Sequence, residues 1–532
     1  MKKLILLLLT LFSISTTHAQ GVALDKKFGN NGIVITDTDP FCDEMTYALA
    51  CQSDGKILAA GQSGVSGQSY VSAGVIRYHK NGKVDSSFGT NGRTLLVPPA
   101  NVNAPAKAIA IQKIASTEYI LVAGFRVDGS SIHAPVAGYI ARLKSDGTLD
   151  AGFGTNGMAM LPDANVSNMI VDATGRILLT GYENYMDSPA VMGVFRLLPN
   201  GQPDNSFGTN GFASVQYPDY SDATMLALQK DGKIILSGRT WTLPTNDNFD
   251  MLVARLKTDG STDSTFGTNG LVRIDPDTNE VLPAGVALQS DGKIIICATS
   301  DAGIGNRFYM TRLLANGTRD NSFGSVGEVR TNFGNNQAWC KAVLVQKDDK
   351  IYLSGYASPT STQNDYGFAI ARYKPNGVVD STFGVNGRDT TNRGRNSGAS
   401  AAIITPDNSV IAAGWSYWSQ PLGRFDDFML VKYLSGLETK IADPNNNIQA
   451  AVYPNPARGN VNISYTLQQA DVLSMQLTDI TGRIVKAFTT NETRRAGKHQ
   501  AVLQIDNTIA PGQYVLQIAG ATSQSNIKLT VQ

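Results

Sequence analysis

The chain has 532 residues, and its 45 lysine and arginine residues nearly balance its 44 aspartate and glutamate residues, for a formal net charge of +1. This balance argues against a nucleic-acid-binding protein, which would carry a basic excess, and against an acidic tail. Charged residues make up only 17% of the chain while glycines number 52, and the length exceeds one ordinary hydrophobic core, so we expect an all-β chain of two or more domains.

The N-terminus predicts a signal peptide over residues 1–19. Two lysines after Met1 precede the apolar run Leu4–Phe12, and small or polar residues follow as far as Ala19. The apolar run is too short to span a bilayer, which favours a signal peptide cleaved after Ala19 over a membrane anchor. No later stretch is long and apolar enough to span a membrane, so we expect an exported mature chain that begins at Gln20 and has no transmembrane segment.

A motif, Asp-x-x-Phe-Gly-x-x-Gly, recurs seven times along the chain, roughly every 60 residues. Its phenylalanines are Phe28, Phe88, Phe153, Phe207, Phe266, Phe323 and Phe383. A period of this length predicts one supersecondary unit that is copied around or along an axis.

The signals within each unit follow a constant order. An apolar strand such as 32–35 follows the motif, and after a variable loop comes a hairpin such as 226–236, whose Asp-Gly turn needs positive φ at both central residues. A second variable loop leads to a strand such as 251–256, which ends in an Asn-Gly or Asp-Gly turn. Four short strands per unit predict one blade, so residues 20–434 are expected to form a seven-bladed β-propeller. An open solenoid would need capping repeats, which the sequence does not show.

A repeated charge pair supports closure of the ring. Six arginines each precede the aspartate of the next motif at the same short spacing, which predicts structural ion pairs. These pairs are Arg77–Asp85, Arg142–Asp150, Arg196–Asp204, Arg255–Asp263, Arg312–Asp320 and Arg372–Asp380. Asp25 has no upstream partner, and Lys432, at the corresponding place in the seventh unit, has no downstream aspartate. We hypothesise that residues 24–29 lie beside the last blade and that Asp25 meets Lys432.

Three motifs in fixed order carry a resemblance to a known family. They are Phe-Gly-x-Asn-Gly, Gln-x-Asp-Gly-Lys-Ile and Arg-[Tyr/Leu]-x-x-[Asn/Asp]-Gly, and they cover residues 22–436. In this combination the chain resembles the delta-60 repeat, a bacterial β-propeller repeat family of uncharacterised function. The sequence departs from the pattern at 113–119 in the second unit and at 348–349 in the sixth. The resemblance implies a fold and no activity.

A second β-rich module, residues 448–532, follows a polar linker at 435–447. Its alternating apolar residues predict a small Ig-like β-sandwich, with strands near 461–467, 477–484, 514–516 and 527–531.

Four segments of this module resemble the type A sorting domain of the type IX (Por) secretion system. They are Val-Tyr-Pro-Asn-Pro at 452–456, Asp-Ile-Thr-Gly-Arg at 479–483, Pro-Gly-Gln-Tyr at 511–514 and Lys-Leu-Thr-Val-Gln at 528–532. The resemblance implies that the type IX machinery is a partner, that the chain crosses the outer membrane, and that it ends up secreted or on the cell surface. An accessory binding sandwich is the alternative.

Four cysteines would share an oxidising compartment after export. Cys42 with Cys51 is the local pairing, and Cys297 with Cys340 would join consecutive repeats. Free buried thiols are the alternative. No CxxC spacing occurs, so neither a zinc site nor a redox motif is supported.

Familiar catalytic motifs such as GxSxG, HExxH and the Walker loop are absent. The mature chain has only three histidines, His79, His133 and His499. This small number argues against a Ser-His-Asp triad or a multi-histidine metal site. Glycoside chemistry with two carboxylates stays open, because it needs no histidine.

The two variable loops of each blade should emerge on one face of the propeller, opposite the regular turns. These loops carry aspartates and asparagines, and they hold the candidate ligand-binding aromatics Tyr182, Tyr185, Trp241, Tyr309, Trp415, Tyr417 and Trp418. Aromatic rings beside carboxylates and amides suit a carbohydrate or another polar ligand, although such rings also cap the ends of blades. No cofactor is expected; the acidic loops allow Ca²⁺ but show no EF-hand spacing.

Together these patterns favour an exported, non-catalytic binding or adhesion scaffold with an extracellular glycan or protein ligand. The competing interpretation is an extracellular polysaccharide hydrolase or lyase that uses carboxylates on the loop face. The sequence does not identify the ligand.

Overall fold

The computed structural model describes residues 23–38, 42–64, 70–96, 102–128, 136–162, 164–183, 191–241, 249–276, 280–301, 305–334, 337–358, 366–392, 396–420, 423–435, 448–467, 470–479, 483–506, 508–520 and 524–532. They belong to two compact units, within residues 1–435 and 436–532. All regular structure among them is β-strand, which confirms the all-β prediction, and they contain no helix that could cross a membrane. The expected signal peptide and the stretch 436–447 lie outside the described residues.

The described part of the first unit forms seven antiparallel sheets, numbered here in chain order and given from the innermost strand outward. Sheet 1 is β2 (Glu44–Cys51), β3 (Ile57–Gly64), β4 (Val71–Tyr78) and β5 (Arg93–Leu96); sheet 2 is β7 (Ala106–Ile114), preceded by the short β6 (Val102–Asn103), then β8 (Thr117–Asp128), β9 (Val136–Leu143) and β10 (Met158–Pro162). Sheet 3 is β11 (Ala164–Val171), β12 (Ile177–Glu183), β13 (Val191–Leu197) and β14 (Phe212–Ser214); sheet 4 is β15 (Tyr220–Leu228), β16 (Ile234–Trp241), β17 (Asp250–Leu256) and β18 (Leu271–Ile274). Sheet 5 is β19 (Glu280–Leu288), β20 (Ile294–Asp301), β21 (Asn306–Leu313) and β22 (Glu328–Thr331); sheet 6 is β23 (Ala338–Val345), β24 (Ile351–Ala357), β25 (Gly367–Tyr373) and β26 (Arg388–Thr391). Sheet 7 is β27 (Ser397–Ile404), β28 (Val410–Gln420), β29 (Gly423–Tyr433) and β1 (Ile33–Thr36).

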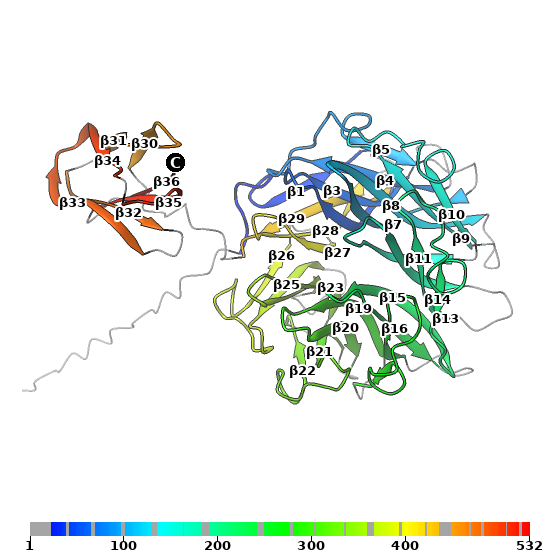
Figure 1. Ribbon diagram of the computed structural model, residues 1–532. Helices are drawn as coiled ribbons and strands as arrows, with labels where there is room; N and C mark the ends of the chain where they lie inside the picture. The colour runs from blue at the N-terminus through cyan, green and yellow to red at the C-terminus, as the bar shows by residue number, and fades with distance from the viewer. Residues whose placement is uncertain are drawn as a thin grey trace, which may run out of the picture. The chain divides into compact units, whose positions relative to one another are not determined.

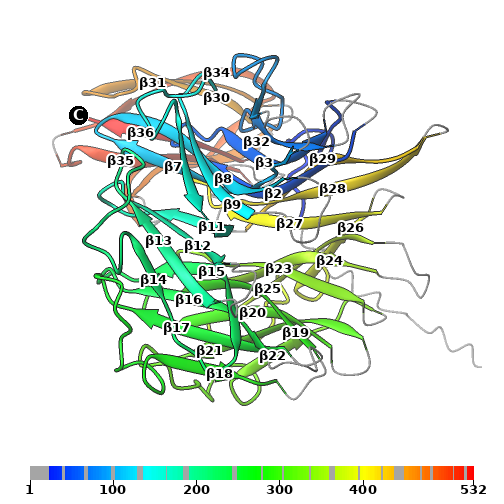
Figure 2. The same cartoon turned by 90° about the vertical axis from the view of Figure 1, so that its right-hand side faces the viewer.

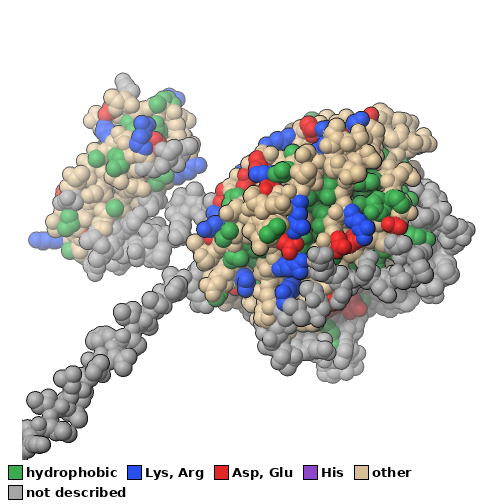
Figure 3. Space-filling model, turned by 90° about the horizontal axis from the view of Figure 1, so that it is seen from below, with side chains coloured by type: hydrophobic (Ala, Val, Ile, Leu, Met, Phe, Trp, Pro, Cys, Tyr) green, Lys and Arg blue, Asp and Glu red, His purple; other side chains and the backbone are tan. Residues whose placement is uncertain are grey.

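The sheets are arranged as a propeller, which confirms that part of the prediction. Each innermost strand contacts the innermost strands of both neighbouring sheets, in the order β2, β7, β11, β15, β19, β23, β27 and back to β2. In Figure 1 the strands β19, β20, β21 and β22 follow one another from the middle of the unit to its edge, and Figure 2 shows the sheets from a second direction. Basic and acidic side chains lie interspersed on the described part of the face shown in Figure 3.

The boundary of the repeat differs from the predicted one. We expected the strand after each Phe-Gly motif to open a new blade, but it is the outermost strand of the preceding sheet: β5 pairs with β4, and β1 pairs with β29. The reason is a reversal of the chain at the motif, where Asp85 N donates to Arg77 O (2.9 Å) and Phe88 N donates to Asp85 O (3.1 Å). The chain is thus folded back onto the sheet that it has just left.

The two ends of the first unit meet in sheet 7. Asp25 N donates to Lys432 O (2.9 Å), and Lys432 Nζ lies 3.3 Å from Asp25 Oδ2. Phe28 is buried between sheets 7 and 1, in one cluster with Ile411 and Ile57. We call this junction the seam. The N-terminal segment therefore supplies the outer strand that the last sheet lacks.

The Arg-Asp pairs join neighbouring sheets as well as bracing one turn. The shortest nitrogen-to-oxygen distances are 2.9 Å for Arg77–Asp85, 2.7 Å for Arg142–Asp150, 2.8 Å for Arg196–Asp204, 2.8 Å for Arg255–Asp263, 2.8 Å for Arg312–Asp320 and 2.9 Å for Arg372–Asp380. Each guanidinium also donates to a backbone carbonyl further along the chain, as Arg142 does to Pro199 O in sheet 3 (2.8 Å), and packs over the phenylalanine of its motif. A carboxylate, a carbonyl and an aromatic ring thus surround each buried arginine.

The second unit contains two antiparallel sheets among its described residues. One is β30 (Gln449–Tyr453), β31 (Asn460–Leu467) and β34 (Gly497–Gln504); the other is β33 (Ile484–Arg494), β32 (Asp471–Asp479), β35 (Gly512–Ala519) and β36 (Gln524–Val531). Val461, Ile463, Tyr465 and Leu467 alternate inward along β31, as expected, and share one core with side chains of the second sheet.

Candidate functional site

A β-bulge interrupts every innermost strand of the first unit at the same place. The register shifts by one residue at Tyr47, Lys107, Ser167, Thr224, Ala284, Lys341 and Ser400. In six sheets a glycine of the second strand faces the bulge; a Cβ at Gly61 would lie 1.7 Å from Met45 O, and one at Gly414 would lie 1.9 Å from Gly398 O. A side chain at these six positions would clash with the facing backbone, whereas in sheet 5 Ala298 stands opposite the bulge.

A channel of about 280 Å³ runs between the seven innermost strands, all of which contribute to its wall. Six of the seven bulged residues line it: Tyr47, Lys107, Ser167, Ala284, Lys341 and Ser400. The bulges therefore place side chains that differ from sheet to sheet around one axis. Bulges beside a functional site are common, because they redirect single side chains.

The two lysines are the charged members of this wall. Lys107 Nζ lies 3.6 Å from the ring centroid of Tyr47 and 5.7 Å from that of Phe125, and Lys341 Nζ lies 5.8 Å from that of Tyr356. Burial lowers the pKa of Lys107 to about 8 and that of Lys341 below its ordinary value. Both ammonium groups are thus held in a partly desolvated, aromatic environment.

An aromatic cluster lies where β23 begins and β24 ends, on the side of the propeller that we call the loop face. Trp339 stacks on Tyr356 (ring centroids 5.1 Å apart), and Tyr366 meets both rings at 5.3 and 5.7 Å. Trp415 of sheet 7 lies 6.1 Å from Tyr356, and Gly398 leaves room for the Tyr356 side chain. All four rings are only half-buried.

This cluster contains only part of the predicted set of aromatics. Trp415 belongs to it, and Tyr417 is half-buried two residues further along β28. Trp241 forms a separate group with Tyr220 on sheet 4, their centroids 5.7 Å apart. The prediction that Tyr309 binds a ligand is wrong. Its side chain is 0% exposed, within a core cluster of sheets 4 and 5, so it cannot face a ligand.

The remaining three predicted aromatics fall outside what the structure describes. Tyr182 and Trp418 lie in strands whose side chains at these positions are not among the described ones, and Tyr185 is outside the described residues. Sequence reasoning missed Trp339, Lys107 and Lys341. A signal for the two lysines was present, because in six sheets a glycine of the second strand stands opposite the bulge; Trp339 lies outside the bulge and had no such signal.

Two carboxylates interact at the junction of sheets 7 and 1. Burial, and then the charge of Asp43, raise the pKa of Asp426 to about 6. Asp426 Oδ1 is buried and accepts no hydrogen bond from the described residues. Burial, and then the charges of both aspartates, also raise the pKa of Tyr47. A carboxyl group whose pKa is raised toward neutrality beside a second carboxyl group is a familiar arrangement for acid catalysis.

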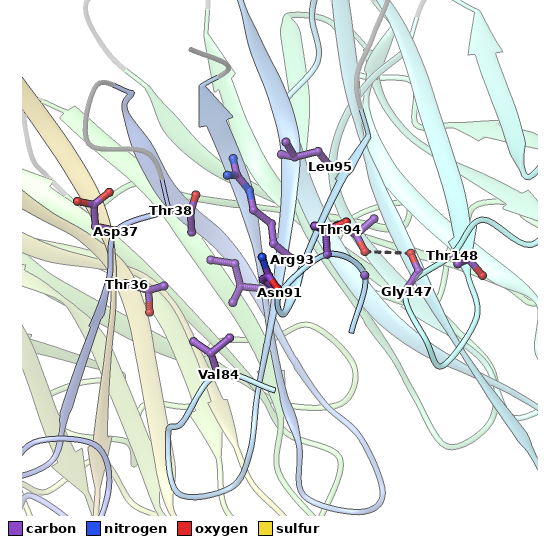
Figure 4. A pocket seen from close by; sticks show the side chains of 13 residues that line it. Thr36, Asp37, Thr38, Val84, Asn91, Arg93, Thr94, Leu95, Gly147 and Thr148 are labelled. Atoms are coloured by element: carbon purple, nitrogen blue, oxygen red, sulfur yellow. Dashed lines mark hydrogen bonds between the residues drawn. The ribbon is translucent and has the colours of Figure 1, made fainter. Parts of the chain in front are cut away.

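An outer groove of about 950 Å³ lies against sheets 7, 1 and 2. Figure 4 shows Arg93 and Thr94 on its wall, with Thr94 Oγ1 donating to Gly147 O (2.9 Å). A second groove, at 206–214 and 259–261, has in its wall the repeat positions that correspond to 89–95 and 147–148 of the first, but none that correspond to 36–38. Because it recurs between other sheets, we assign the outer groove to the repeated frame.

The four cysteines are free thiols in the structure. The local pairing of Cys42 with Cys51 is wrong, because β2 separates them by more than roughly 20 Å, whereas a disulfide needs neighbouring Cα atoms. Cys297 of sheet 5 and Cys340 of sheet 6 are both buried, and burial followed by a hydrogen bond with Cys340 raises the pKa of the Cys297 thiol.

No group of three or more His, Cys, Asp and Glu side chains among the described residues is placed to hold a metal ion. Several of the acidic loop residues considered for Ca²⁺, such as Asp39, Asp163 and Asp277, lie outside the described residues.

Comparison with solved structures finds chains of similar fold at low identity. They include polysaccharide lyase Uly1 (10% identity, 79% of this chain and 94% of that chain covered, TM-score 0.43). A PL25 ulvan lyase bound to -[GlcA(1-4)Rha3S]- (12%, 77% and 95%, 0.40) and Drosophila Plexin A in complex with Semaphorin 1b (8%, 77% and 88%, 0.39) are others. At these identities and TM-scores the likeness carries no argument about activity, and a search of curated proteins finds no match.

Two family models match the chain. The model described as "Domain of unknown function (DUF5122) beta-propeller" matches residues 52–88, 120–153, 173–207, 229–266, 289–323 and 346–383. The model described as "Secretion system C-terminal sorting domain" matches residues 451–532. The chain therefore carries six DUF5122 beta-propeller repeats followed by a secretion-system C-terminal sorting domain.

Proposed function

We propose that this protein is an exported binding scaffold, in which a propeller presents a saccharide-binding surface and the C-terminal domain directs secretion. The observation that carries the binding role is the aromatic cluster of Trp339, Tyr356, Tyr366 and Trp415 on the loop face. Four half-buried rings from two sheets offer apolar faces for the C–H faces of a sugar. Rings that served only the core would be fully buried, as Tyr309 is.

A glycan panel with the purified full-length protein tests this role. Trp339→Ala combined with Trp415→Ala should weaken binding at least about tenfold, because buried aromatic anchors dominate such contacts. Trp241→Ala is the matched control, since its ring packs against Tyr220 outside the cluster. Wild-type affinity of the double variant, with loss in Trp241→Ala, would place the site elsewhere.

We count seven blades, one more than the matches to the family model. Each match runs from the first hairpin of one sheet to the phenylalanine of the following motif, as 52–88 does. The corresponding seventh segment would run from about 405 to 433 and continue at 25–28, across the seam, where no continuous stretch of sequence can contain it. For the second unit, two sheets around one core support an Ig-like sandwich.

The sorting-domain match supports secretion through the type IX system to the cell surface or the exterior. Removal of residues 1–19 as a signal peptide is part of this proposal and rests on the sequence pattern alone. N-terminal sequencing of the exported protein should find Gln20 first. Deletion of residues 452–532 should leave the propeller folded in the periplasm. Surface appearance of the truncated protein at the wild-type level would contradict the sorting role.

A polysaccharide hydrolase or lyase is the second candidate, and the Asp43 and Asp426 pair favours it. The raised pKa of Asp426 suits a general acid, and Asp43 supplies the second carboxyl group that such chemistry needs. Product formation from a bound polysaccharide, abolished by Asp426→Asn while binding persists, would establish catalysis. Unchanged polysaccharide after prolonged incubation would remove this candidate.

A further inference from the structure

Two lysines from different sheets line the central channel. Lys107 is on sheet 2 and Lys341 on sheet 6, so three sheets (3, 4 and 5) lie between them on one side of the ring and two (7 and 1) on the other. Both occupy the bulged position of their strand, and both line the channel. They therefore approach one axis from nearly opposite sides.

No carboxylate among the described residues lies within 4.0 Å of either ammonium group. The nearest acidic pair, Asp43 and Asp426, acts on Tyr47. Removing an ammonium group partly from water without an ionic partner costs free energy, so two such groups in one channel suggest a functional role. Aromatic contacts with Tyr47 and Tyr356 recover only part of that cost.

The frame itself does not require lysine at these positions. The same bulge carries Ser167, Thr224, Ala284 and Ser400 in other sheets, and the bulge forms there equally. A short uncharged side chain thus satisfies the fold. The lysines are additions to the repeated structure and belong to what the channel does.

We propose that Lys107 and Lys341 form an anion site that binds the carboxylate or sulfate group of an acidic saccharide, whose sugar ring stacks on the aromatic cluster. This inference rests on the proposed saccharide-binding function and names its ligand class. Tyr356 links the two parts, because its ring contacts Trp339 on one side and lies 5.8 Å from Lys341 Nζ. The hydroxyls of Ser167 and Ser400, which also line the channel, can donate to further oxygens of the anion.

The charge state of the channel agrees with this assignment. With a pKa of about 8, Lys107 still carries its charge at pH 7, so it can pair with an anion. An oxyanion between the two lysines would restore part of the solvation that burial removes from each ammonium group.

The test compares neutral, uronate-bearing and sulfated oligosaccharides of equal length on the full-length protein, by calorimetry at low and at moderate salt. Acidic saccharides should bind at least tenfold more tightly than neutral ones, and salt should weaken only the acidic ones. Lys341→Met and Lys107→Met should remove this preference, while Lys341→Arg should retain it. Lys113→Met is the matched control, since Lys113 is exposed at the other end of β7.

Each outcome bears on a stated claim. Equal affinity for neutral and acidic saccharides, or a preference that survives in the variant lacking both channel lysines, overturns the anion site and leaves the saccharide-binding function standing. Absence of binding by any saccharide overturns both. Tryptophan fluorescence and thermal unfolding establish that each variant is folded, so a loss of preference in a folded variant is a property of the channel.

Discussion

The seam should be as firmly packed as any other junction between sheets, and Phe28→Ala measures this. Phe28 is 1% exposed and touches side chains of sheets 7 and 1, just as the fully buried Phe207 lies between sheets 3 and 4. The turn glycines Gly82 and Gly260 stand equally close to these rings, each with a Cβ position 3.1 Å from a ring carbon. Truncating a buried phenylalanine costs about 3–5 kcal/mol, so both variants should lose that much free energy of unfolding.

Urea unfolding followed by tryptophan fluorescence is the assay. All four tryptophans lie before residue 436, so the signal reports the first unit alone. Hydrogen exchange should show where each variant opens first. In Phe28→Ala the amides of 33–36 should exchange faster than those of the rest of the unit, whereas in Phe207→Ala they should not. A loss below about 1 kcal/mol for Phe28→Ala, beside the full loss for Phe207→Ala, would refute the closed seam.

Four further outcomes follow from individual contacts. Arg255→Met should lower the free energy of unfolding by about 3 kcal/mol, the low end for a broken buried ion pair, because a lysine remains 3.2 Å from Asp263. Adding Asp263→Leu to this variant should restore most of the lost stability. Equal losses in the single and the double variant would contradict the pairing. Burial alone would raise the pKa of Asp263, but hydrogen bonds and the neighbouring cations hold it below its ordinary range. The stability from this pair is therefore full above about pH 4 and is lost as the pH falls through the lower folded pKa, so the deficit of Arg255→Met should shrink in urea titrations at decreasing pH. Val326→Asn should stabilise the fold by about 1 kcal/mol in the same titration, since the exposed valine holds a φ of 53° that asparagine tolerates better. Protein taken from an oxidising compartment should carry a Cys297–Cys340 disulfide in non-reducing peptide mapping, because the two thiols meet; recovery of both as alkylated single peptides would contradict it.

The frame was predictable because its residues act through local geometry that each copy repeats. Gly82 and Gly260 have φ values of 85° and 91°, which explains why a glycine ends every Asn-Gly or Asp-Gly turn. The expectation of positive φ at both central residues of the Asp-Gly turn is wrong, because Gly232 has a φ of 82° while Asp231 does not have positive φ. The spacing of Arg255 and Asp263 brings their charges together across one such turn. The sheet boundary was not predictable in this way, since the pairing partner of a strand is set by the direction in which the motif reverses the chain.

The site was less accessible from sequence for a different physical reason. A bulge changes the face toward which a strand residue points, so period-two patterns assign the residues around Lys341 to the wrong side. Trp339 was assigned no role, although it stacks on Tyr356 across one strand pair. The prediction for Tyr309 was wrong for the opposite reason. Its position near a variable loop suggested an exposed side chain, whereas β21 places that side chain in the core between sheets 4 and 5.

The contacts of the frame explain why the channel is free to vary. Arg142 holds Asp150 within its own repeat and Pro199 O in the next sheet, so the sheets are joined near the regular turns, away from the bulges. No such contact depends on the bulged residue, which can be tyrosine, lysine, serine, threonine or alanine without loss of closure. A ring built in this way concentrates its variation on the axis and the loop face. If the protein binds a ligand as proposed, the differences among the seven copies at these positions set its specificity.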